Sequence, residues 1–321
     1  MSNNGPRCLA SRRLASGEAI GTIARHSRQR RADHGECDGL QLRGCSSHQA
    51  ILANQGYHVH HRCLLLFVLC LITATVSAQT PRGTQHSIFA GTGKPSKQLA
   101  AYPPGQPSGK PTDIDLGNPF GIELIDNTIW ITSIDDHCIY RGTIEGGSLR
   151  RVAGNGLIGY DGDGGPAIEA RFNWPHEVRA DSEGNLLVAN TRNHVIRRIY
   201  AYSGIVTTIA GCGEPGFAGE GLTGKSVKFN QPHSVVLDGR GGLLVADTSN
   251  HRLRRIDLKS GNVETISGNG NKQLPRDGDD ARSSPLFGPR SLAVEPDSIW
   301  IALREGNSIW RIDRTTNRLH H

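Results

Sequence analysis

Short apolar runs separated by polar, glycine-rich breaks alternate along residues 120–321, and this alternation recurs with a period of 57 residues. In the copy that starts at Pro175, the runs 177–180, 186–190, 195–200 and 205–210 are rich in β-branched residues and predict four strands. The breaks between them have the lengths and residue types of antiparallel hairpin turns. No stretch of helical periodicity competes with this interpretation.

Four copies of the repeat are visible. The tetrapeptides PHEV, PHSV and PRSL begin at residues 175, 232 and 289, and a drifted copy, PFGI, begins at residue 119. A fixed period of this size indicates an array of like units. A four-stranded sheet with apolar side chains on both faces must stack against neighbours, as the blades of a β-propeller do. We therefore predict an all-β propeller of four-stranded antiparallel blades, at 120–153, 176–210, 233–267 and 290–321.

The period is longer than the roughly 40 to 45 residues of an ordinary blade. The additional residues fall in one place, the 22-residue connections between blades at 154–175, 211–232 and 268–289. Equivalent connections lie on one face of a propeller, and a rim of loops on one face is where propellers usually bind.

The stretches NHVIRR at 193–198 and NHRLRR at 250–255 resemble the signature of the NHL-repeat β-propeller family. The connection GYDGDGGPA at 159–167 is similar to that of secreted bacterial members common in planctomycetes. The resemblance extends from about Ser87 to His321. It implies the propeller fold but little about activity, because this fold carries many functions.

Members of this family usually close six blades, whereas four are present here. We expect an incomplete six-bladed ring, and the alternative is a closed four-bladed ring. Residues 79–119 are expected to form an N-terminal strand and a linker loop. Within them, SIFAG at 87–91 matches TTIAG at 207–211, so residues 88–91 are predicted to pair with a neighbouring blade as a fourth strand.

The front of the chain carries no repeat. Residues 1–62 are expected to be disordered and to reflect an over-extended gene model. In 63–78 an apolar run precedes small residues around Ala78, which is typical of a secretory signal peptide. The run is shorter than the roughly 20 residues of a membrane span. We therefore expect a mature chain that begins at Gln79, has no membrane span and is secreted or held in the periplasm or cell envelope.

This segment also changes what charge and cysteine content imply. Residues 1–62 hold nine arginines against four acidic residues, so the net charge of +6 falls to about +1 in the mature chain. Nucleic-acid binding is therefore not expected. Five of the seven cysteines precede residue 79, which excludes a metal cluster of cysteines. Cys138 and Cys212 occupy different places in the repeat, and their pairing stays open.

Four residues share the repeat position at the mouth of the predicted channel: Phe120, His176, His233 and Arg290. This position varies in chemistry from blade to blade, and we predict that it contacts a ligand. The two imidazoles could hold zinc or another divalent ion if a third ligand completed the set. Residues 232–234 are similar to a zinc-ligating stretch of the peptidyl-hydroxyglycine amidating lyases. The alternatives are hydrogen bonding to loop backbone and an organic or peptide ligand bound without metal.

Other repeated polar residues are expected to have structural roles. His137, His194 and His251 fall in the turn between second and third strands and are predicted to cap it. A ladder of contacts between blades is predicted for Arg141, Arg198, Arg255 and Arg311. The Asp161 to Gly165 segment lacks the ligand spacing of a calcium loop. Only its acid at 163 repeats, as Glu220 and Asp277, which favours turn stabilisation.

The sequence thus predicts a secreted, non-catalytic propeller scaffold, with no resident cofactor, that binds a protein or carbohydrate ligand on its loop-rich face. The alternative is a metal-dependent lyase or lactonase with its site at the channel mouth. Such an enzyme needs a positioned base, for which Glu177, Asn190 and Asp247 are the candidates. No Ser-His-Asp spacing, phosphate loop or nucleophile elbow is present.

Overall fold

The computed structural model describes residues 87–96 and 100–321. The predictions for residues 1–62 and 63–78 lie outside the described residues. The described chain is all-β apart from three short 3-10 turns, which are η1 (Pro111–Asp113), η2 (Thr191–Asn193) and η3 (Thr248–Asn250). None of its helices is long and apolar enough to cross a membrane.

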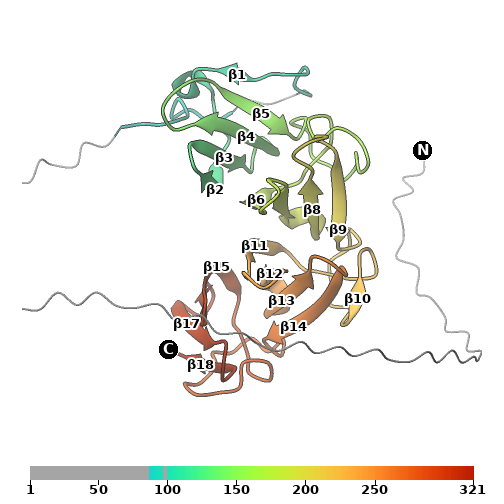
Figure 1. Ribbon diagram of the computed structural model, residues 1–321, viewed down its shortest axis with the longest axis vertical. Helices are drawn as coiled ribbons and strands as arrows, with labels where there is room; N and C mark the ends of the chain where they lie inside the picture. Colours follow the sequence, from blue (N-terminus) through green and yellow to red (C-terminus); the bar gives the residue numbers. More distant parts are fainter. Residues whose placement is uncertain (1–86, 97–99) are drawn as a thin grey trace, which may run out of the picture. The chain divides into compact units, whose positions relative to one another are not determined.

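The strands form four antiparallel sheets that follow one another along the chain (Figure 1). The first sheet contains β1 (Ser108–Gly109), β2 (Pro119–Ile125), β3 (Thr128–Ser133), β4 (Cys138–Thr143) and β5 (Leu149–Ala153). The second contains β6 (Pro175–Ala180), β7 (Leu186–Asn190), β8 (Val195–Ile199) and β9 (Val206–Ala210).

The third sheet contains β10 (Leu222–Thr223), β11 (Pro232–Leu237), β12 (Gly242–Asp247), β13 (Arg252–Asp257) and β14 (Asn262–Ser267). The fourth contains β15 (Pro289–Glu295), β16 (Ser298–Leu303), β17 (Ser308–Asp313) and β18 (Arg318–His320). Every repeat copy is therefore a four-stranded meander, as its apolar runs predict. The first strands of the copies, β2, β6, β11 and β15, lie toward one another in Figure 1.

Each junction between successive sheets is a hydrophobic core to which both sheets and the long connection contribute. Between the first and second sheets, Ile139 packs with Val178 and with Phe172 from the connection. Phe229 and Leu286 take the place of Phe172 at the next two junctions. All three connection residues are fully buried. Because burial of such a side chain stabilises the fold by about 1.5 to 3 kcal/mol, the long connections are part of the core.

Threonine hydroxyls join neighbouring sheets near the axis. Thr191 Oγ1 donates to the carbonyl of Pro232 at 2.7 Å, and Thr248 Oγ1 donates to the carbonyl of Pro289 at 2.6 Å. Each bond runs from the end of a second strand to the first strand of the next sheet. Since these bonds are buried, they fix the spacing between successive inner strands.

The two outer faces of the set of sheets are open. Ile122 on β2 is 58% exposed, whereas the equivalent Val178 and Val235 are fully buried against the preceding sheet. On the last sheet Ile309 is 61% exposed, whereas the equivalent Leu253 is fully buried. No strand of the first sheet pairs with the fourth in the part of the chain that is described. These exposures agree with an incomplete ring and oppose the closed four-bladed alternative.

The prediction of a strand at residues 88–91 is wrong. These residues join no sheet, and Phe89 and Ala90 instead pack against the core on the open side of the first sheet. The fifth strand of that sheet is β1, whose Ser108 is in register with Arg150 on β5. The match between SIFAG and TTIAG identified an apolar pair. A fourth strand needs the third strand of a sheet as its partner, and each third strand is already paired with the fourth strand of its own sheet.

The open face of the fourth sheet gives a direct test. We expect Leu253→Ala to lower the free energy of unfolding by about 2 to 5 kcal/mol, because it leaves a cavity in a closed core. Ile309→Ala, at the equivalent position, should cost less than about 1 kcal/mol, because that side chain already contacts solvent. Urea denaturation of both variants measures the difference. Equal losses would contradict the open face.

Candidate functional site

The channel-mouth residues are positioned by the same backbone device in all four sheets. A residue with positive φ precedes a proline at the start of the inner strand; for β6 this residue is Trp174, with a φ of 56°. The register then shifts by one residue between Pro175 and Glu177, which places His176 in a β-bulge. Bulges redirect side chains. Equivalent shifts occur at the start of β2, β11 and β15, so each bulge presents one residue at the axis.

These bulges bring the four predicted site residues together. The ring centroids of Phe120 and His176 lie 4.5 Å apart, and those of His176 and His233 are also 4.5 Å apart, both in edge-on arrangements. The guanidinium carbon of Arg290 lies 5.7 Å from the Phe120 centroid. Sheets that are far apart in sequence therefore contribute to one cluster, as the repeat position predicts. Phe120 is its most exposed member, at 46%.

The two histidines are buried and uncharged at neutral pH. Burial is the main cause that lowers the pKa of His176 to about 4 and that of His233 to about 3, and the Arg290 charge adds to both effects. His233 Nδ1 lies 2.9 Å from the Gln231 carbonyl and 3.0 Å from Thr248 Oγ1. An Nδ1–H bond to the carbonyl leaves Nε2 as an acceptor. The sequence predicts that the first strand of the second copy begins at residue 177, whereas both histidines already belong to strands, His176 to β6 and His233 to β11.

The described residues fit a metal poorly at this place. Neutral imidazoles are suitable ligands, but the other two positions of the cluster hold Phe120, which has no donor atom, and Arg290, which is cationic. No group of three His, Cys, Asp or Glu with metal-binding geometry occurs among the residues described. The cluster therefore offers a metal ion only two neutral donor groups, those of His176 and His233.

The candidate bases serve backbone contacts or ion pairs. Asn190 and Asp247 each accept a hydrogen bond from the backbone of the connection entering their own sheet, from Asn173 N and Asn230 N respectively. Burial raises the pKa of Asp247 to about 7. Glu177 pairs with Arg179 at 2.6 Å, although burial still raises its pKa. These contacts explain each carboxylate or amide without a catalytic role.

The turn histidines connect successive sheets. His137, His194 and His251 all adopt positive φ, between 54° and 57°. His194 Nδ1 accepts the backbone N–H of Gln231 at 3.1 Å, and His251 Nδ1 accepts that of Gly288 at 3.1 Å. The donor in each case is the positive-φ residue that precedes the next inner strand. In its own turn each histidine is held by its backbone N–H, while its ring orients the residue that precedes the next channel-mouth residue.

The predicted arginine ladder between sheets is wrong in its residues. Arg255 pairs with Asp238 and Asp257 of its own sheet, at 2.6 and 3.5 Å. In the second sheet, Arg197 precedes the predicted Arg198; it is fully buried and pairs with Asp163 of the connection at 2.8 Å. The sequence could not separate the two adjacent arginines, because adjacent strand residues point to opposite faces of the sheet and only the packing of the neighbouring elements decides which of them is buried.

The repeated acids fasten each connection to the outer strand of the sheet it enters. Asp163 accepts the backbone N–H of Thr208, and Glu220 accepts that of Thr265 at 2.7 Å. Asp277 accepts the N–H of His321. This agrees with stabilisation rather than calcium binding.

The two cysteines of the described chain, Cys138 and Cys212, are both buried free thiols, and burial raises the pKa of Cys138.

Residues 229–256 match the family model of the NHL repeat. NHL repeat-containing protein 2 from Bos taurus is 27% identical over 190 residues, which cover 56% of this chain and 25% of that protein. Protein SUPPRESSOR OF QUENCHING 1, chloroplastic, from Arabidopsis thaliana is 29% identical over 142 residues, which cover 43% and 13%. The chain thus spans a quarter or less of the length of these two relatives.

Among solved structures, a protein of unknown function from Bacteroides thetaiotaomicron has a TM-score of 0.49 at 14% identity, over 64% of this chain and 49% of that chain. A streptogramin B lyase has a TM-score of 0.42 at 18% identity, over 68% and 56%. The four stacked antiparallel sheets define a repeat protein of propeller type. Within that class, this chain carries an NHL repeat at residues 229–256 and is similar to NHL repeat-containing proteins. Its assignment to the planctomycete type stays a prediction.

The burial of His176 predicts a specific pH dependence. In the unfolded chain its pKa returns to about 6.5, so at pH 5 the unfolded state holds a proton that the folded state lacks. Stability from this group is complete above pH 6.5 and falls as the pH drops toward 4. His176→Phe, which installs the side chain of the first sheet, should remove this slope.

We expect wild type to lose roughly 1 to 2 kcal/mol more than His176→Phe between about pH 7 and pH 5. Urea denaturation at the two pH values gives the comparison, and the difference between the proteins removes contributions of other groups such as Asp247. Identical slopes would contradict the buried, neutral histidine.

Proposed function

We propose that this chain is a non-catalytic binding module outside the cytoplasm, whose protein or carbohydrate ligand contacts the channel mouth. The observation that supports it most is the cluster of Phe120, His176, His233 and Arg290, one residue from each sheet. Residues needed only to fold a repeat are expected to be alike in every copy, whereas this position combines an apolar ring, two neutral imidazoles and a cation.

The chemistry of the cluster suits recognition. The half-exposed Phe120 ring offers an apolar contact surface. Arg290 offers donors in a rigid fork. His176 is buried, packs edge-on against the Phe120 ring and stays uncharged near neutral pH. Binding sites generally combine an apolar surface with a few fixed polar groups in this way. The long connections are tied to the outer strands of their sheets by Asp163 and Glu220.

The alternative function, a metal-dependent lyase or lactonase, would need a metal and a positioned base at the same place. It is supported by the two imidazoles alone. Metal analysis of the purified chain decides between the two proposals: stoichiometric zinc that is lost in a His176→Ala, His233→Ala double variant would favour the enzyme. Because both side chains are buried, the double variant must first be shown to remain folded.

We expect Phe120→Ala and Arg290→Ala each to weaken binding of the ligand about tenfold or more, since each removes a contact at the centre of the site. A glycan array and a panel of immobilised extracellular proteins, probed with the full chain, would identify the ligand. Phe217→Ala is the matched control, because Phe217 is an equally exposed phenylalanine, at 44%, in a long connection. Binding that survives both mouth substitutions would overturn the proposal.

A further inference from the structure

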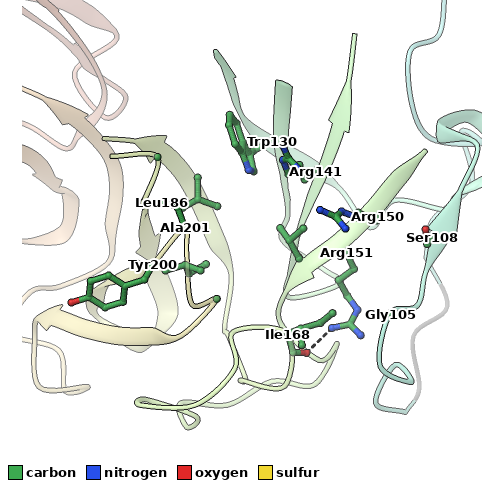
Figure 2. Close-up of a pocket in the computed structure, with 14 residues that line it drawn as sticks. Gly105, Ser108, Trp130, Arg141, Arg150, Arg151, Ile168, Leu186, Tyr200 and Ala201 are labelled. Atoms are coloured by element: carbon green, nitrogen blue, oxygen red, sulfur yellow. Dashed lines mark hydrogen bonds between the residues drawn. The ribbon is translucent and has the colours of Figure 1, made fainter. Parts of the chain in front are cut away.

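A separate cavity of about 740 Å³ lies between the first and second sheets. Figure 2 shows Trp130, Arg141 and Arg150 of the first sheet on one side and Leu186 of the second on the other, while the ring of Tyr200 points away from the arginines. This volume falls within the range of roughly 300 to 1,000 Å³ typical of small-molecule sites. The cavity does not share a residue with the channel-mouth cluster.

One row of side chains crosses the first sheet along this cavity. Trp130 is in register with Arg141, Arg141 with Arg150, and Arg150 with Ser108, across β3, β4, β5 and β1. Residues in register point to the same face of a sheet. The two arginines are therefore direct neighbours, and like charges placed opposite one another destabilise a sheet.

Nothing in the described structure neutralises these two charges. Neither guanidinium forms a hydrogen bond or ion pair with a described residue, and no Asp or Glu lines the cavity. Arg141 only approaches the ring of Trp130, with its guanidinium carbon 5.9 Å from the centroid. Arg151, the third arginine in the lining, is different. Its guanidinium donates to backbone carbonyls, including that of Ile168 at 2.7 Å (Figure 2). Arg151 is therefore already satisfied by hydrogen bonds and stabilises the lining of the cavity.

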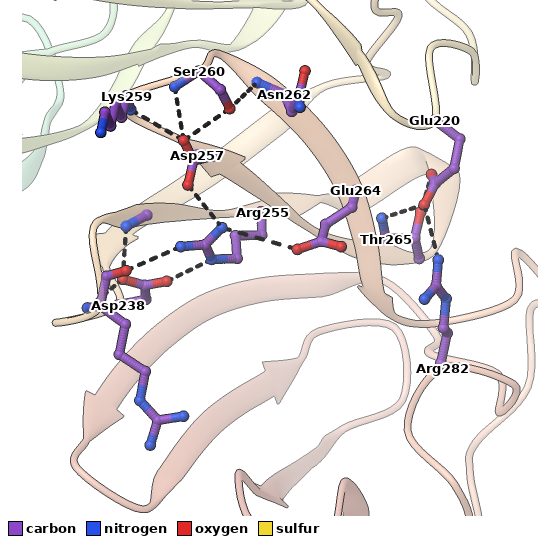
Figure 3. Close-up of polar contacts among 12 residues, drawn as sticks. Glu220, Asp238, Arg255, Asp257, Lys259, Ser260, Asn262, Glu264, Thr265 and Arg282 are labelled. Carbon is purple, nitrogen blue, oxygen red and sulfur yellow. Dashed lines mark hydrogen bonds and ion pairs between the residues drawn. The ribbon is translucent and has the colours of Figure 1, made fainter. Parts of the chain in front are cut away.

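The third sheet shows how the same position is neutralised elsewhere in the chain. Arg255 is the equivalent of Arg141, and its cross-strand partner is Glu264 in place of Arg150. Figure 3 shows Arg255 surrounded by carboxylates, with Asp238 at 2.6 Å and Glu264 at 3.9 Å. The paired cations of the first sheet are thus a feature of this cavity, and the repeat does not require them.

We propose that this cavity binds a small organic anion, whose carboxylate lies between Arg141 and Arg150 and whose flat apolar body lies against Trp130 and Leu186. Guanidinium groups match carboxylates in charge and in the geometry of their donors. A bound carboxylate offsets the repulsion between the two arginines. Trp130 and Leu186 supply apolar contact for an aromatic ring or for the face of a sugar. This site is independent of the channel-mouth function.

Isothermal titration of the full chain with phenylacetate and with glucuronate tests the proposal and separates an aromatic acid from an acidic sugar. We expect at least one of these carboxylates to bind, and its neutral counterpart, phenylacetamide or glucose, to bind about tenfold more weakly or less. The neutral compound removes the charge but keeps the body. Failure of both acids to bind, or equal affinity of acid and neutral counterpart, overturns the proposal.

Variants then locate the site. Arg150→Glu reproduces the Arg255–Glu264 pair of the third sheet, so it should abolish binding of the acid while leaving the urea midpoint unchanged or higher. Arg150→Gln, which removes the charge without reversing it, should weaken binding about tenfold and covers the case in which reversal impairs folding. Arg276→Glu, an exposed arginine in a long connection, is the charge-matched control and should retain affinity. Affinity retained by Arg150→Gln would overturn the site.

Trp130→Leu tests the apolar part of the same site. Leu187 and Leu244 occupy this position in the second and third sheets, in register with Arg198 and Arg255. The variant should therefore fold while binding acid and neutral counterpart more weakly by a similar factor. Unchanged affinity for both would remove the aromatic contact from the proposal.

Discussion

A four-stranded sheet of this repeat is apolar on both faces, and the need to cover both faces is the constraint on which the rest of the structure depends. Every residue of β7, Leu186 to Asn190, is buried, so no face of that strand is available to water. Each sheet must therefore stack on the next, and the long connections must supply residues such as Phe172 to close the junction. Where the stacking stops, as at Ile122 and Ile309, the same positions are exposed.

Stacking alone would allow sheets to slide or rotate, and the repeated polar contacts prevent it. Thr191 and Thr248 fix the inner strands, His194 and His251 hold the residue before each inner strand, and Asp163 and Glu220 hold the outer strands. Because these contacts use main-chain atoms of the next element, they tolerate changes of side chain at the axis. That tolerance permits Phe120, His176, His233 and Arg290 to differ while remaining in one cluster.

The fold and the composition of the channel mouth were predictable from the sequence because both follow from the period. Strands recur every 57 residues, and a residue that occupies one repeat position must lie at one level of the stack. The burial of His176 was not predictable, since it depends on neighbours from two other sheets, Phe120 and His233. The unneutralised pair of Arg141 and Arg150 was also hidden, because the two residues become neighbours only through strand register.

The sequence by itself therefore determined the four strands of each repeat copy and their order, the length of the connections and the residues that face the axis, because each of these follows a periodic pattern. Only the tertiary structure decided which of two adjacent arginines is buried, as with Arg197 and Arg198, and that residues 88–91 join no sheet. It also decided that the outer faces stay open and that a cavity with two unpaired cations lies beside Trp130. These features depend on which surfaces meet across a junction, and contacts between distant segments leave no periodic trace in a single chain.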